Sequence, residues 1–192
     1  SSSPTASLVR KVLDFFGGRE DLATQTLRVV DPRTFVEDAV RVIRGMQFAA
    51  RFGLTATPET KALMRTMVHE LPHEPAERFE KEWDKLLGAV EPSRGILLGW
   101  ETGVFATLYP EIDVLFATPQ ESEWHPEGNV GIHTCLTIDR AARLVREKNL
   151  PFDVARPILY GAFCHDFGKA TTTREKEGRM RAHGHDEAGV EP

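Results

Sequence analysis

The chain has 192 residues, of which 41% are hydrophobic and 28% are charged, and its formal net charge at pH 7 is -5. This composition excludes a disordered polymer, and no apolar run approaches the roughly 20 residues that a membrane-spanning helix needs. The negative total argues against a protein that coats nucleic acid, although a local basic face can still bind phosphate. The first residues lack the basic and then apolar segments of a signal peptide. Cys135 and Cys164 lie in apolar helical patterns, so we expect a cytoplasmic protein without a membrane partner.

Apolar spacing in the first 118 residues predicts helices packed on helices. Thr34 and Glu37 form a capping-box pattern, which predicts a helix that starts at Thr34 and ends near Gly53. Prolines and cap residues before other apolar stripes predict four more helices. These are expected at 57–68, at about 76–88, from residue 92 onward and at about 104–108. No run in this half alternates over the length of a strand.

The apolar pattern lapses near residues 118–123, where we place a domain boundary. Beyond it the periodicity predicts a helix over about 130–148 and a second one from Pro151 into the pair His165-Asp166. The inward positions of the first of these are Ile132, Leu136, Ile138, Ala142 and Val145. After Lys169 the chain turns polar and charged up to Arg181, and one more helix is expected at the very end. The predicted fold class is all-α.

A metal site is the first chemical hypothesis. An apolar helix that ends in adjacent imidazole and carboxylate groups, as at His165-Asp166, can aim two kinds of metal ligand at one point. Packing of two consecutive antiparallel helices would bring His133 to this pair. Two imidazoles and one carboxylate leave metal positions open for water and a phosphate oxygen, and the ammonium of Lys169 can hold a phosphate. Each residue alone is modest evidence for a metal site, since a histidine on a helix is more often a hydrogen-bonded polar residue than a metal ligand.

A second hypothesis concerns Asp38, Arg41 and Arg44, whose spacing by three predicts a column on one helix face. Such a column is most often a solvated ridge of ion pairs. The alternative is that a carboxylate and a guanidinium, fixed side by side, present an acceptor and paired donors to the edge of a nucleobase.

Several motifs together resemble known families. His133, the run His165-Asp166-Phe167-Gly168-Lys169 and His183-Gly184-His185 are similar to the HD-domain metal phosphohydrolases, an all-helical superfamily that cleaves phosphomonoesters and phosphodiesters. Further motifs narrow the resemblance to the bacterial class II tRNA nucleotidyltransferases, of the multifunctional CCA-adding type that carries an HD domain. These motifs are Gly17-Gly18-Arg19-Glu20-Asp21-Leu22, Leu27-Arg28-Val29-Val30, Glu37-Asp38-x-x-Arg41-x-x-Arg44, Phe48-Ala49-Ala50-Arg51-Phe52-Gly53, Leu108-Tyr109-Pro110-Glu111-Ile112, Trp124-His125-Pro126-Glu127 and Gly131-Ile132-His133-Thr134.

The resemblance implies a division of the chain. Residues 1–23 would be a remnant that leads into the neck, 24–72 the neck with its base-recognition helices, 73–118 the body, and 119–192 the N-terminal part of an HD domain. In that family the neck aspartate and arginine act as a protein template for the base of CTP or ATP. The matching residues are Asp38 and Arg41, with Glu37 as a helper and Arg44 as the second arginine.

For the HD part, the resemblance implies metal-dependent phosphatase and 2',3'-cyclic phosphodiesterase activity. His133, His165 and Asp166 would bind a divalent metal of the Mg, Mn or Ni class, with His185 (or His183) as a further ligand or acid/base. His165, Asp166 and Lys169 would form the catalytic group, with Lys169 on the phosphate. The expected partners are the tRNA 3' end, CTP and ATP, and a cyclic or terminal phosphate at the HD site.

Two departures limit these expectations. The chain contains no Asp-x-Asp pair, the carboxylates that hold the ions of nucleotidyl transfer, so we expect that these 192 residues alone do not add nucleotides. It also stops before the distal aspartate that completes an HD site, which would make it a fragment. The alternatives are a headless HD phosphohydrolase and a non-catalytic RNA- or nucleotide-binding module, whose phosphate contacts would be Arg41, Arg44, Arg51, Lys61 and Arg65.

Overall fold

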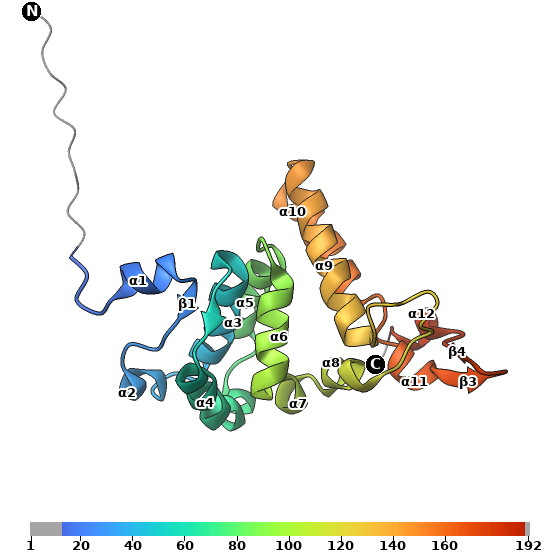
Figure 1. Ribbon diagram of the computed structural model, residues 1–192, viewed down its shortest axis with the longest axis horizontal. Coiled ribbons are helices and arrows are strands. Elements are labelled where there is room, and N and C mark those ends of the chain that lie inside the picture. Colours follow the sequence, from blue (N-terminus) through green and yellow to red (C-terminus); the bar gives the residue numbers. More distant parts are fainter. Residues whose placement is uncertain (1–12, 191–192) are drawn as a thin grey trace, which may run out of the picture.

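A computed structural model describes residues 13–190, in which short loops connect helices and two small sheets (Figure 1). The helices, with 3-10 helices named η, are α1 (Gly18–Ala23), α2 (Pro32–Phe35), α3 (Val40–Phe52), α4 (Pro58–Met67), η1 (Val68–His73), α5 (Glu77–Leu87), α6 (Pro92–Thr102), α7 (Val104–Leu108), α8 (Pro110–Asp113), η2 (Val114–Ala117), α9 (Val130–Glu147), α10 (Phe152–Cys164), α11 (Lys169–Thr172) and α12 (His185–Ala188). The strands are β1 (Thr26–Leu27), β2 (Thr55–Ala56), β3 (Arg174–Lys176) and β4 (Arg179–Arg181). Because each strand has only two or three residues, the predicted all-α class is confirmed.

The start of α3 differs from the prediction. Asp31 accepts the Arg33 amide and Pro32 occupies the first helical position, so the short helix α2 forms where the capping box was expected. The hydroxyl of Thr34 donates to the carbonyl of Asp31, and α3 begins only at Val40, whose amide donates to the Asp38 carboxylate. The capping-box prediction is therefore wrong. Its other end is confirmed, since Gly53 ends α3 with a φ of 64°.

The other long helices lie where the sequence predicted them. Thr57 caps α4 and accepts the Thr60 amide, and α9 and α10 begin at Val130 and Phe152. One expected inward position is wrong, since 54% of Leu136 is exposed. The sequence also missed the strands, of which β1 and β2 are parallel and β3 and β4 form an antiparallel hairpin.

Helices α3, α5 and α6 enclose the centre of the hydrophobic core. A side chain at Gly95 on α6 would lie 2.5 Å from the backbone oxygen of Met46 on α3, so the glycine permits the two helices to touch. Trp83 on α5 extends this core toward α10: its ring lies 5.6 Å from that of Phe163, and its indole N–H donates to Tyr109.

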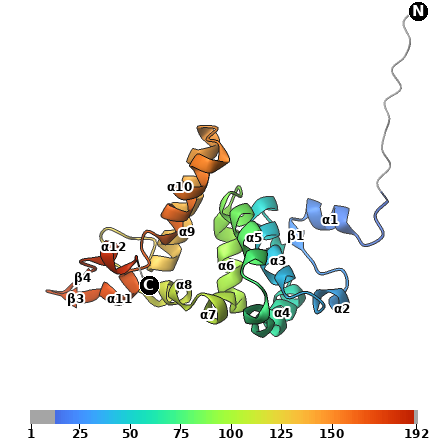
Figure 2. The same cartoon turned by 180° about the vertical axis from the view of Figure 1, so that it is seen from behind.

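The antiparallel pair α9 and α10 rises beside this bundle, as both directions of view show (Figures 1 and 2). Polar contacts attach this helix pair to α5 and α6. The Asp139 carboxylate on α9 accepts the Ser93 amide at the start of α6, and Asp84 on α5 accepts from Arg156 and Tyr160 on α10. Buried residues before and after residue 118 belong to one hydrophobic core, so the predicted domain boundary marks no break in packing and stays a prediction.

None of the helices that the structure describes is both long and apolar enough to cross a lipid bilayer. The predicted N-terminal remnant is described only from residue 13 onward, where α1 is its one helix, and its first twelve residues lie outside the described part.

Candidate metal centre

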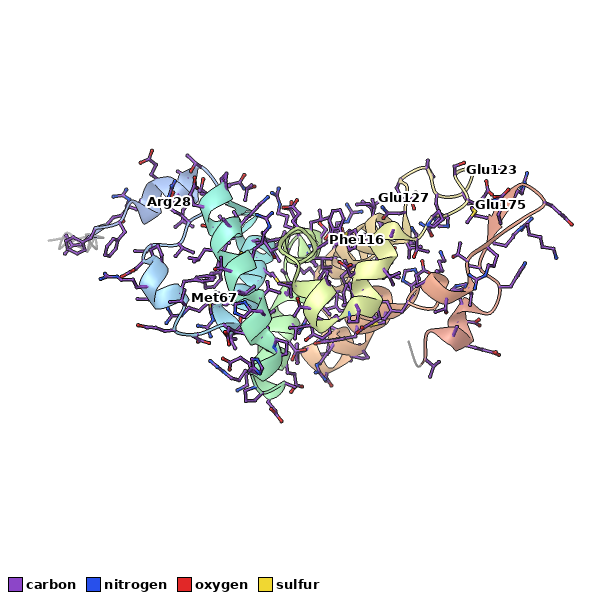
Figure 3. All side chains as sticks on the ribbon, turned by 90° about the horizontal axis from the view of Figure 1, so that it is seen from below. Arg28, Met67, Phe116, Glu123, Glu127 and Glu175 are labelled. Atoms are coloured by element: carbon purple, nitrogen blue, oxygen red, sulfur yellow. The ribbon has the colours of Figure 1, made fainter. Side chains whose placement is uncertain are left out.

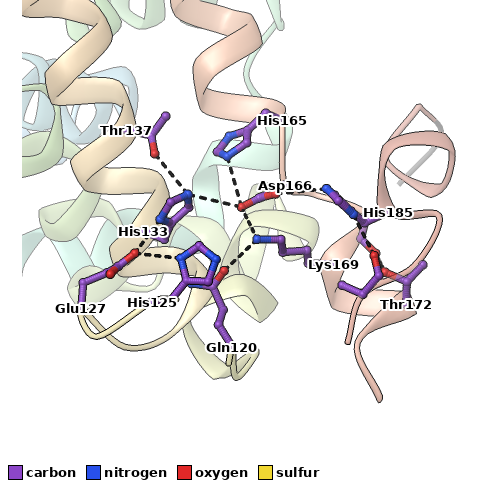
Figure 4. Close-up of polar contacts among 12 residues, drawn as sticks. Gln120, His125, Glu127, His133, Thr137, His165, Asp166, Lys169, Thr172 and His185 are labelled. Atoms are coloured by element: carbon purple, nitrogen blue, oxygen red, sulfur yellow. Dashed lines mark hydrogen bonds and ion pairs between the residues drawn. The ribbon is translucent and has the colours of Figure 1, made fainter. Parts of the chain in front are cut away.

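The predicted cluster forms where α9 begins and α10 ends. Asn129 caps α9 by accepting the Ile132 amide at 2.9 Å, which fixes the first turn that carries His133. His165 directly follows the last residue of α10, and its Nδ1 lies 2.9 Å from the carbonyl oxygen of Ala162. Because the two helices are antiparallel, these ends meet, and one carboxylate oxygen of Asp166 faces both imidazoles (Figure 4).

Distances within the cluster suit a shared ion. Oδ2 of Asp166 lies 3.7 Å from Nε2 of His133 and 3.2 Å from Nε2 of His165. One donor atom from each of these residues lies within 4.8 Å of the other two. The sequence thus predicted the convergence of these three side chains, while their roles as ligands stay a prediction.

Asp166 is the buried centre of the cluster, with 1% of the residue exposed. Lys169 lies 2.8 Å from its Oδ2, and Nε2 of His185 lies 3.6 Å from its Oδ1. Burial would raise the pKa of Asp166, but the nearby basic groups of His165 and Lys169 outweigh burial and hold that pKa well below its ordinary value. In turn, the adjacent Asp166 carboxylate raises the pKa of His165.

The donor set fits a divalent cation. Oδ2 of Asp166 is buried and makes no hydrogen bond of regular geometry, although basic groups face it. A carboxylate oxygen that faces two imidazoles combines hard and intermediate donors that Mg, Mn, Ni or Zn can accept. His133, His165 and Asp166 are therefore the residues that would hold an ion.

A second layer of polar residues surrounds these groups, and the sequence assigned a role to none of them. Oε1 of Glu127 lies 2.7 Å from Nδ1 of His133, and the hydroxyl of Thr137 lies 3.4 Å from Nε2 of the same ring. Gln120 accepts from the Lys169 ammonium at 2.8 Å. The motif around Glu127 was part of the family resemblance. However, Glu127 lies in a loop, where no helical or strand periodicity predicts that its carboxylate contacts the ring of His133.

A cavity of about 270 Å³ opens beside the cluster. The Gln120–His125 loop forms one wall, and the segment from β4 to α12 forms another, with the side chain of Lys169 between them. His183 and His185 both line this cavity, so the structure brings the two later histidines to its wall and only His185 within 3.6 Å of Asp166.

The predicted base-recognition residues do not form one ridge. Asp38 precedes α3, and its carboxylate lies 3.0 Å from Arg78 on α5. Arg41 and Arg44 do lie on α3 and line a separate cavity of about 280 Å³, and Glu37 is exposed. The Asp38 carboxylate pairs with Arg78, and the Arg41 guanidinium donates to the carbonyl of Thr34, while the part of Asp38 and Arg41 in base recognition stays a prediction.

Comparison with known proteins places the chain in a family. Residues 53–116 match the family model described as a probable RNA- and SrmB-binding site of polymerase A. Over 184 residues the chain is 42% identical to the multifunctional CCA protein of Neisseria gonorrhoeae (strain NCCP11945), which covers 95% of this chain. It is 40% identical over 187 residues to the multifunctional CCA protein of Actinobacillus pleuropneumoniae serotype 5b, again over 95% of the chain. The chain belongs to the family of the multifunctional CCA proteins.

The chain spans 42% and 44% of the length of these two relatives. Solved structures of CCA-adding enzymes in complex with ATP and with CTP align to 80% and 86% of this chain and to 41% and 51% of theirs. Their TM-scores are 0.47 and 0.48 and their identities 24% and 23%, and a likeness of this degree carries no functional argument.

For this multifunctional CCA family member, the match to the RNA-binding family model and the candidate metal centre occupy different segments. The model covers the part from Gly53 to Phe116, which includes α4 to α8, whereas the first residue of the His and Asp cluster is His133. The match to the family model therefore does not depend on the residues of the candidate metal centre.

Proposed function

We propose that this chain is part of a CCA-adding tRNA nucleotidyltransferase and that its metal centre hydrolyses phosphoesters, as a 2',3'-cyclic phosphodiesterase and phosphatase. The first half rests on the similarity to multifunctional CCA proteins over 95% of the chain. The second half rests on one observation above all: the buried carboxylate of Asp166 faces the imidazoles of His133 and His165, and it also pairs with Lys169, which lines an open cavity.

The residues of the centre suit this chemistry. A divalent ion held by His133, His165 and Asp166 would polarise a phosphoryl oxygen and lower the pKa of water. The Lys169 ammonium, at the cavity wall, would bind the non-bridging oxygens of the phosphate and neutralise charge that develops on them. His185 lies on the opposite side of Asp166 from α9 and would exchange a proton with the leaving oxygen.

Replacement of Asp166 tests the hydrolytic half. In an enzyme that contains this chain, we expect Asp166→Ala to abolish divalent-metal-dependent hydrolysis of a 2',3'-cyclic nucleotide, because the carboxylate that faces both imidazoles is lost. Asp186→Ala is the matched control, since Asp186 is an exposed aspartate at the start of α12. Unchanged hydrolysis in Asp166→Ala would remove the cluster from the mechanism.

The cavity beside α3 supports a second function, recognition of the base of CTP or ATP. Arg41 and Arg44 bring two guanidinium groups to this cavity, and Phe48 adds an aromatic ring. We propose that Arg41 and Arg44 read the base, with Asp38 and Glu37 supporting them from the turn before α3.

Nucleotide choice is the measurement that tests this second function. In an enzyme that contains this chain and adds nucleotides, Arg41→Ala should lose its choice between CTP and ATP before it loses affinity for tRNA. Arg33→Ala is a suitable control, because the Arg33 side chain is 89% exposed and pairs with Asp31. Equal loss with every nucleotide would assign Arg41 a structural role.

A further inference from the structure

Glu127 makes two hydrogen bonds that end on the same oxygen. Its Oε1 lies 2.7 Å from Nδ1 of His133 and 3.0 Å from Nδ1 of His125. The two rings stand nearly perpendicular to each other, with centroids 4.6 Å apart. One carboxylate in the loop before α9 therefore links the first turn of that helix to the wall of the cavity.

This contact decides which nitrogen of His133 is free. A carboxylate only accepts hydrogen bonds, so the neutral ring that faces it carries its proton on Nδ1. Its Nε2 then keeps a lone pair, and this atom lies 3.7 Å from Oδ2 of Asp166. The hydroxyl of Thr137 is close enough to donate to the same lone pair at 3.4 Å.

We infer that Glu127 is the positioning residue of the metal centre: it holds His133 as the Nδ1–H tautomer with Nε2 aimed at the ion. The inference rests on the proposed metal-dependent function. Histidine ligands commonly donate their second nitrogen to a carboxylate, which orients the ring and makes it a stronger base. Through His125 the same carboxylate also holds the loop that forms the cavity wall.

The test combines two measurements on the whole chain. Nitrogen-15 spectra of the histidine rings, recorded without metal, report the tautomer of His133, and calorimetric titration with Mn²⁺ reports affinity. In Glu127→Ala we expect His133 to shift toward the Nε2–H form and Mn²⁺ affinity to fall by about 10- to 100-fold. Glu127→Gln keeps one acceptor oxygen and should restore part of both. Glu123→Ala, a loss of an exposed acid in the same loop, should change neither.

An unchanged tautomer and affinity in Glu127→Ala would overturn the inference, and Glu127→Gln decides it if the alanine variant does not fold. Asp166→Ala separates this inference from the proposed function. If that variant binds Mn²⁺ like the unchanged chain, the proposed metal centre is wrong, while the spectra still decide whether Glu127 sets the His133 tautomer.

The β3–β4 hairpin carries a second inference, from its strand register. Arg174 pairs with Arg181 and Lys176 pairs with Arg179, and residues directly opposite in an antiparallel pair share one face. Four cationic side chains thus lie on one face of the hairpin, and all four residues are exposed. Only Arg179 has an acidic partner among the described residues, Glu123 at 3.2 Å.

Like charges that face each other across strands destabilise a hairpin, so a polyanion on this face would relieve the repulsion. The hairpin lies at the end of the molecule where Glu123 and Glu175 are labelled in Figure 3. Met180 and Arg181 also line the cavity at the metal centre. We infer that this face binds backbone phosphates of the RNA strand whose terminal phosphate enters the centre, which again rests on the proposed function.

Salt dependence tests this surface. We expect the double variant Arg174→Gln/Lys176→Gln to bind a short single-stranded RNA more weakly, with a slope of log affinity against log salt that is smaller by about 0.7 for each lost phosphate contact. Arg143→Gln/Lys148→Gln removes the same charge from the end of α9 that lies far from the hairpin and serves as control.

Comparison of two substrates completes the test. The hairpin variant should lose more activity on RNA with a 2',3'-cyclic end than on the cyclic mononucleotide. An unchanged salt slope, or equal losses on both substrates, would overturn this assignment. Absence of mononucleotide hydrolysis in an enzyme that contains this chain would contradict the proposed function instead, and the salt slope would still decide whether the hairpin binds RNA.

Discussion

The ammonium of Lys169 lies 2.8 Å from Oδ2 of Asp166 and donates to Oε1 of Gln120, also at 2.8 Å. The lysine therefore occupies the side of the carboxylate that also faces His133 and His165. A divalent ion and an ammonium repel each other, so an ion bound by Asp166 would weaken the lysine pair and favour contact between Lys169 and a phosphate.

Lys169→Met separates these two roles. Without the competing ammonium, we expect Mn²⁺ affinity to be maintained or to rise. Hydrolysis should fall by roughly 100- to 1,000-fold, the cost typical of losing one group that stabilises developing charge. Calorimetry and a hydrolysis assay measure the two effects, with Lys148→Met as control. A parallel loss of affinity and activity would show that Lys169 mainly holds Asp166 in place.

The pH dependence follows from the raised pKa of His165. A raised pKa means that the folded chain holds the proton more tightly, so this pair stabilises the metal-free chain below the ordinary pKa of 6.5 and the effect is lost as pH rises through the folded value. Metal binding needs the neutral ring, so Mn²⁺ affinity should rise over the same window. Urea unfolding and metal titration across this range check both trends. Asp166→Asn should abolish the stability trend, and its persistence would assign the trend to another group.

What the sequence could predict depended on how local each signal was. The end of α3 is a local signal, because Gly53 suits a left-handed cap. The start of α3 depends on more distant contacts. Asp31-Pro32 and Thr34 are competing helix caps three residues apart, and the Asp38 carboxylate forms an ion pair with Arg78 on α5. Sequence alone gave no means to rank these alternatives.

The same contrast holds at the metal centre. His133 and His165-Asp166 were predictable because consecutive antiparallel helices bring their adjoining ends together. Glu127 was not, because its role depends on the path of an irregular loop. The β3–β4 hairpin was hidden in a charged stretch, where Glu177 and Gly178 make a two-residue turn with positive φ but no apolar alternation marks the strands.

Gly168→Ala should disrupt the approach of α12 to the centre. A Cβ at Gly168 would lie 2.0 Å from the backbone oxygen of His185 and 2.6 Å from the amide of Gly189, so backbone must move. We expect a loss of about 1–3 kcal/mol in the free energy of unfolding, as for other overpacked sites, and weaker Mn²⁺ binding if His185 is a ligand.

Gly161→Ala is the matched control for this substitution. Gly161 lies within α10, and a Cβ there would meet nothing within 4 Å. Since alanine favours a helix interior, this variant should gain up to about 1 kcal/mol. Urea unfolding compares the two, and equal effects on stability would mean that the contact between α11 and α12 yields without cost.

The carboxylate of Asp139 on α9 caps α6 from outside that helix. It accepts the backbone amide of Ser93 at 2.9 Å and the Ser93 hydroxyl at 2.6 Å. Asp139→Ala would leave a helix start without its acceptor, so we expect a loss of about 1–2 kcal/mol in the free energy of unfolding. Ser93→Ala removes only the hydroxyl contact and should cost less, because the amide keeps its partner. Urea unfolding of both single variants and the double variant gives the coupling energy.

Mn²⁺ affinity should stay unchanged in each folded variant, since His133 is held by its own turn. A change in affinity would mean that the attachment of α9 to α6 also sets the geometry of the metal centre.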